Sequence, residues 1–150
     1  MNMIQSLIRW CKRFAPYLGI SILFFAFVLL IVFVFNYYSP NSPALAQHLN
    51  PYYLLLRWDA IHYLNISTVG YAGGGAVFFP LYPLLLAVFS FFFPIVFSGY
   101  AVSFLSLAFA LYYLNLLLAE QGRMDLRDRA IVLLLAFPTA VIFSFIYTES

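Results

Sequence analysis

Long apolar runs separated by only a few charged residues constrain the fold of this chain more than any other feature. Hydrophobic residues make up 65% of the sequence and charged residues 8%, whereas a soluble domain carries roughly 25% charged residues. The mean hydropathy is correspondingly high, at +0.97. These proportions exclude the soluble globular classes and predict an all-α integral membrane protein.

The first membrane span is predicted over about residues 18–38, after a basic segment that contains Arg9, Lys12 and Arg13. Roughly 20 helical residues cross a hydrocarbon core of about 30 Å, and basic flanks tend to stay in the cytoplasm. The apolar run is too long for the core of a signal peptide, so we interpret it as an uncleaved helix. The loop that follows is therefore expected outside the cytoplasm.

This first extracytoplasmic loop is expected to hold helices that lie along the outer membrane face. Pro40 and Pro43 end the first helix, and residues 44–66 have helical character but too many polar residues to span the membrane. Residues 79–97 are apolar but are interrupted by prolines, including Pro94. We predict that 44–66 and 79–97 are interfacial or re-entrant segments.

Positive charge decides how the remaining apolar residues are arranged. If both 81–97 and 100–118 crossed the membrane, the arginines within 120–129 would lie outside the cytoplasm. A single crossing places them inside, which the distribution of basic residues in membrane proteins favours. We therefore predict further spans over 100–118 and 130–147.

The chain, residues 1–150, would then be the N-terminal part of one polytopic domain in a multi-pass protein. Its membrane would be the bacterial plasma membrane or, in a eukaryote, the endoplasmic reticulum.

Residues that could carry chemistry gather just after residue 56, where an acid, a cation and an imidazole lie close together. Asp59 is expected at the membrane–water boundary, where partial loss of hydration favours proton uptake by a carboxylate and suits a general base. It could equally cap a short helix, because Asp-Ala-Ile-His is typical of a first helical turn. Arg57 could bind a lipid-linked phosphate or extend from a helix end towards the headgroups.

His62 follows Asp59 by three residues, so the two side chains share one face of a helix. Two such residues are too few for a metal site. His62 either donates a hydrogen bond that orients the carboxylate or is an ordinary interfacial histidine. Glu149 ends the last apolar run on the same side as Asp59 in the predicted topology, and an acid in that position is a candidate functional residue. The chain lacks the basic stripe that would indicate nucleic-acid binding.

Several motifs, in order and spacing, resemble the PIG-V mannosyltransferase family. They run from Arg57 to the end of the chain: Arg57-Trp58-Asp59-Ala60-Ile61-His62-Tyr63, Gly70-Tyr71, Phe78-Phe79-Pro80-Leu81-Tyr82-Pro83, and Phe137-Pro138 followed by Tyr147-Thr148-Glu149-Ser150. The resemblance implies a GT-C-like helix bundle, of which this chain would be the N-terminal part. It also implies that the Trp58-Asp59 pair of the first external loop is functionally important.

The resemblance further implies an enzyme that moves a sugar, mannose in this family, from a polyprenyl-phosphate carrier to a lipid-linked or glycan acceptor. Transfer would occur at the extracytoplasmic face, with Asp59 as general base and His62 orienting it. Residues expected to contact the substrates are Arg57, Trp58, Tyr71, Phe79, Tyr82 and Glu149. The donor substrate would be the polyprenyl-phosphate sugar, and no cofactor is predicted. No metal-binding residues are predicted, and whether a divalent metal takes part is left open.

The competing interpretation is a non-catalytic polytopic membrane protein, such as a scaffold or a transporter fragment, or an inactive truncated relic of an enzyme. A transporter would place ionisable residues at mid-bilayer and repeat its broken helices. In this sequence the ionisable residues are expected at the membrane interfaces. The pattern therefore favours the enzyme.

Overall fold

The computed structural model describes residues 3–38, 59–73 and 77–144, and all the regular structure in these ranges is helical. Two helices are long and apolar enough to cross a membrane. The prediction of an all-α chain with membrane-spanning helices is confirmed at that level. Several predicted features lie outside the described residues: Arg57, Trp58, Glu149 and residues 44–58 of the first interfacial segment.

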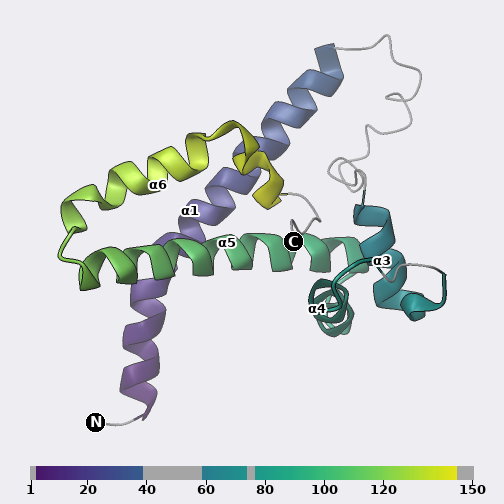
Figure 1. Ribbon diagram of the computed structural model, residues 1–150, viewed down its shortest axis with the longest axis horizontal. Helices are drawn as coiled ribbons and strands as arrows, with labels where there is room; N and C mark the ends of the chain where they lie inside the picture. The colour runs from purple at the N-terminus through teal and green to yellow at the C-terminus, as the bar shows by residue number, and fades with distance from the viewer. Residues whose placement is uncertain (1–2, 39–58, 74–76, 145–150) are drawn as a thin grey trace.

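The first long helix, α1 (Met3–Tyr38), contains the whole of the predicted span 18–38 and also the basic segment before it. Its stretch Met3–Val34 has the length and hydropathy of a membrane span. Pro16 lies inside the helix and cannot donate a backbone hydrogen bond to the preceding turn, which is a common cause of bending. The helix changes direction in its N-terminal half (Figure 1).

The second long helix, α5 (Ile95–Glu120), contains the predicted span 100–118 and begins five residues before it. Pro94 precedes the helix with extended backbone angles, and Gly99 lies buried inside the helix. At the other end Gly122 has a φ of 68°. The N–H of Gly122 donates to the carbonyl of Ala119, and the N–H of Arg123 donates to the carbonyl of Leu118. This pattern is a Schellman motif, which a glycine in the left-handed region permits.

Two short helices lie near the N-terminal end of α5: α3 (Ala60–Val69), followed by the 3-10 turn η2 (Gly70–Gly73), and α4 (Leu81–Ser90). At about 1.5 Å per residue, the ten residues of α4 are too short for a core of about 30 Å. Figure 1 shows α4 almost along its axis while α5 lies across the view, so the two helices are close to perpendicular. A helix with this orientation lies along the membrane surface if α5 crosses the membrane.

The predicted span 130–147 is not one continuous helix in the described residues. Helix α6 (Arg127–Ala136) ends before Phe137, and the 3-10 helix η4 (Pro138–Ser144) follows. Phe137 has an extended conformation, with a ψ of 134°. The ring of the following proline disfavours helical angles at that position. The break therefore has a local cause.

Helices α1 and α5 pack together in opposite chain directions. The ring of Phe14 lies 4.8 Å from that of Phe109, whereas the ring of Phe25 lies 5.3 Å from that of Tyr100. The N-terminal end of α1 therefore lies towards the C-terminal end of α5. As a result, the part of α1 that carries its basic residues lies nearer the end of α5 that the arginines follow, and α3 and α4 lie near the start of α5 (Figure 1).

The buried residues form two clusters along this helix pair. One joins α1 to α3, α4 and the start of α5, with Ala60, Tyr63, Tyr82 and Leu86 among its members. The other joins the N-terminal half of α1 to the middle of α5 and to α6. The first cluster fixes the short helices that carry the candidate site.

Candidate functional site

Asp59 occupies the position immediately before α3, but its carboxylate does not cap the helix. Its backbone carbonyl accepts a hydrogen bond from the Tyr63 N–H at 3.0 Å, as expected for the first turn of a helix. Its side chain makes no capping hydrogen bond, and its backbone angles are already helical. The side chain is half-buried. The carboxylate therefore lies at a helix start without being used to build the helix.

His62 lies one turn further along α3, with an exposed side chain that rests against an aromatic ring. Its ring stacks on Phe78, with centroids 5.3 Å apart and planes 20° apart. No hydrogen bond joins His62 to Asp59 among the described residues. Stacking, rather than a contact with the acid, holds the imidazole in this structure.

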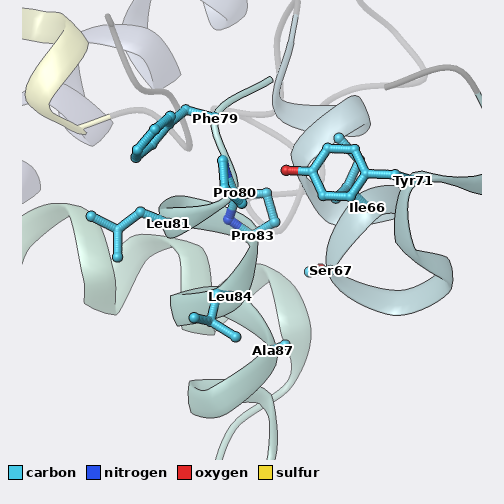
Figure 2. Close-up of a pocket in the computed structure, with 9 residues that line it drawn as sticks. All are labelled: Ile66, Ser67, Tyr71, Phe79, Pro80, Leu81, Pro83, Leu84 and Ala87. Atoms are coloured by element: carbon cyan, nitrogen blue, oxygen red, sulfur yellow. The ribbon is translucent and has the colours of Figure 1, made fainter. Parts of the chain in front are cut away.

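An apolar pocket of about 550 Å³ lies between the C-terminal part of α3 and α4 (Figure 2). This volume is within the range of small-molecule sites. The lining residues come from α3, from η2, from the segment that leads into α4 and from α4 itself: Ile66, Ser67, Tyr71, Phe79, Pro80, Leu81, Pro83, Leu84 and Ala87. Tyr71 and Phe79, two of the predicted substrate-binding residues, are thus brought together here.

The polar atoms of the pocket lining are engaged within the protein. The Tyr71 hydroxyl donates to the Phe78 carbonyl at 2.9 Å, and the Ser67 hydroxyl donates to the Leu64 carbonyl at 2.7 Å. Figure 2 shows the Tyr71 ring directed across the pocket towards Pro80. The remaining wall is aliphatic or aromatic, so the pocket suits an apolar group.

Tyr82, a third predicted substrate-binding residue, lies in the core and does not line the pocket. It is 7% exposed, and its ring meets Tyr63 edge-on at 5.2 Å. Its hydroxyl lies 3.1 Å from the Ser103 hydroxyl and donates to the Gly99 carbonyl at 3.4 Å. Tyr82 therefore joins α4 to α5 behind the pocket wall.

The sequence alone did not indicate Phe78 as the stacking partner of His62, nor most of the pocket lining. One signal was present, since Asp59, His62 and Ile66 are spaced by three and four residues and so share one face of α3. The part of the chain that the structure describes contains no group of three or more His, Cys, Asp or Glu residues arranged to hold a metal ion.

Comparison of the chain with protein-family models, with curated proteins and with solved structures found no match. What the chain does must therefore be inferred from its motifs and from the geometry of α3 and α4.

Proposed function

We propose that this chain carries the acid and an apolar pocket of a membrane glycosyltransferase. The enzyme would move a sugar, mannose by its resemblance to the PIG-V family, from a polyprenyl-phosphate carrier to a lipid-linked acceptor. The motif residues Asp59, His62, Tyr71 and Phe79 lie on or beside α3 and α4, which supports treating them as one site.

The observation that carries this proposal is the arrangement of acid and pocket on a single short helix. Asp59 precedes α3, and Ile66 lines the pocket seven residues later. Seven residues of helix rise about 10 Å. A lipid-linked sugar likewise has two parts, a polar end that reacts and an apolar chain next to it. The carboxylate at the start of α3 would meet the polar end, and the pocket would take the first part of the chain.

The proposed reaction is a displacement at the anomeric carbon. The acceptor hydroxyl transfers its proton to the Asp59 carboxylate while its oxygen forms the new bond to the sugar, and the bond to the carrier phosphate breaks. The sugar changes its anomeric configuration, and the polyprenyl phosphate leaves with the bonding electrons. Since phosphate is already a good leaving group, the protein mainly aligns the reactants and neutralises charge, for which Arg57 is the proposed cation.

The side of the membrane is also part of the proposal. The candidate site lies at the opposite end of the α1–α5 pair from the basic residues. If those residues mark the cytoplasmic side, the reaction takes place on the extracytoplasmic face.

The test is transfer of radiolabelled mannose from polyprenyl-phosphate-mannose into lipid extract by native membranes that contain the protein. We expect Asp59→Asn to lower the rate by at least about 100-fold, because general-base catalysis contributes on that scale. Asp125→Asn, at an exposed carboxylate in the basic loop, is the matched control and should transfer normally. Full activity of Asp59→Asn would contradict the base assignment. No transfer of any polyprenyl-linked sugar by the wild type, with normal insertion, would favour the non-catalytic alternative.

A further inference from the structure

The turn between α4 and α5 displays three consecutive phenylalanines. Phe91, Phe92 and Phe93 are 86%, 78% and 52% exposed. The backbone of this turn is held in place, since the N–H groups of Phe92 and Phe93 both donate to the Phe89 carbonyl, at 3.0 and 3.1 Å. The aromatic side chains are thus presented by an ordered turn.

The exposed phenylalanines continue an apolar stripe on α4. Leu81, Leu84 and Val88 are exposed, and their spacing of three and four residues places them on one face of the helix. The opposite face packs into the core through Tyr82 and Leu86. Helix α4 therefore has one apolar face that the protein covers and a second that it leaves open.

Charge and orientation indicate what covers this second face. No Asp, Glu, Lys or Arg occurs between Asp59 and Glu120, so α4 and the segments that flank it in the described part of the chain contribute no charged rim of the kind that borders a water-exposed protein interface. Large exposed apolar patches mark protein or membrane contacts. Helix α4 is nearly perpendicular to α5 (Figure 1) and is joined to its first turn by the short segment 91–94. The 26 residues of α5 extend about 39 Å, which is longer than a core of about 30 Å, so an α5 that crosses the membrane has its first turn near one edge of that core.

We infer that the exposed stripe of α4 and the Phe91–Phe93 turn insert into the acyl-chain region of the leaflet opposite the basic residues. The partner is the lipid surface itself, and α4 is a monotopic anchor attached to the start of a membrane span. Anchored interfacial helices bury their apolar face about 5–10 Å into the boundary between the headgroups and the acyl chains. Because Leu81 and Leu84 belong both to the stripe and to the pocket, the anchor opens the pocket to the same leaflet. The inference does not depend on the proposed transferase activity.

The experiment measures the depth of single labelled positions in the full chain, reconstituted in vesicles of phosphatidylethanolamine and phosphatidylglycerol. Cys11→Ser removes the cysteine, which is the only one in the sequence, and Phe92→Cys then carries a nitroxide spin label. Collisions with oxygen report the acyl region, and collisions with a water-soluble nickel chelate report the aqueous phase. We expect Phe92→Cys to favour oxygen and the control Asp125→Cys to favour nickel, with at least a tenfold difference in the oxygen-to-nickel ratio.

Two results would overturn the inference. A nickel-dominated ratio at Phe92→Cys, matching that at Asp125→Cys, would place the turn in water. Low collision rates with both reagents would show that protein, rather than lipid, covers the turn. Val88→Cys, on the stripe itself, provides a second position with the same expected ratio if Phe92→Cys does not fold.

Discussion

The ring of His62 on α3 stacks on the ring of Phe78, 5.3 Å away, in the segment that leads into α4. Phe78 also meets the buried ring of Tyr63 edge-on at 5.0 Å, and its carbonyl accepts the hydroxyl of Tyr71. One residue therefore positions the histidine of the candidate site, a core tyrosine and a pocket tyrosine. The motif around residues 78–83 is in this way linked physically to the motif around Asp59.

Replacing Phe78 with alanine should remove the ring contacts with His62 and Tyr63, while the backbone carbonyl that accepts from Tyr71 is kept. Since Phe78 is half-buried, we expect Phe78→Ala to lower the free energy of unfolding by about 2 kcal/mol, within the usual range for lost packing. Thermal unfolding in detergent measures this change. Phe79→Ala, at the adjacent exposed ring, is the control and should cost much less. Equal stability of the two variants would show that the stacked arrangement contributes little.

The carboxylate of Asp59 should be dispensable for the stability of α3. A capping aspartate replaced by alanine typically costs about 1 kcal/mol, but Asp59 makes no capping hydrogen bond. We therefore expect Asp59→Ala to keep the helix content and the unfolding temperature of the wild type, as measured by circular dichroism. A loss of about 1 kcal/mol would mean that the carboxylate is a helix cap after all, and would weaken its assignment as a base.

Removing the hydroxyl of Tyr82 should weaken the attachment of α4 to α5 without changing the pocket wall. The buried hydroxyl lies within hydrogen-bonding distance of the Ser103 hydroxyl and the Gly99 carbonyl. We expect Tyr82→Phe to cost about 1 kcal/mol of stability, the usual net value of such a bond. Tyr71→Phe, at an exposed ring, should cost less in the same unfolding measurement. If the proposed transfer reaction is detected, Tyr82→Phe should leave the KM for the donor unchanged, and a large rise would indicate direct substrate contact.

Filling the pocket should weaken binding of a long apolar chain. Ala87 lines the pocket and is half-buried. In Ala87→Phe, the phenylalanine ring would occupy the space proposed for the carrier. We expect a rise of about tenfold in the KM for the polyprenyl-phosphate sugar, roughly the 1.4 kcal/mol that the loss of one or two buried methylene contacts would produce. Ala110→Phe, at an exposed position on α5, is the size-matched control. Unchanged KM in Ala87→Phe would exclude this pocket as the carrier site.

The basic segment of α1 and the basic loop after α5 should be accessible from the same side of the membrane. Cys11 lies exposed within the basic segment of α1, and Asp125→Cys in a Cys11→Ser background reports the loop after α5. A membrane-impermeant maleimide should label both thiols in inverted vesicles and neither in sealed right-side-out vesicles. Labelling of the two positions from opposite sides would contradict the antiparallel α1–α5 arrangement as a transmembrane pair.

Several local features of this fold were predictable from the sequence, because their causes act over a few residues. The long apolar runs predicted helices, since a helix satisfies its backbone hydrogen bonds within one segment, as a segment in lipid must. The break at Phe137 was readable from the proline that follows it. The prediction did not use this signal, because the continuous apolar run over 130–147 was interpreted as one span.

The contacts that form the candidate site were decided only by the tertiary structure. Spacing alone placed Asp59 and His62 on one face of α3, but not His62 against Phe78, sixteen residues away in the sequence. It also could not separate Tyr71, which lines the pocket, from Tyr82, which is buried between α4 and α5. Both are tyrosines beside the predicted site, and neither local sequence specifies which of the two rings faces a pocket. The side chain that faces the pocket is determined by how α4 packs against α3 and α5, and that packing depends on shape complementarity between segments far apart in the chain.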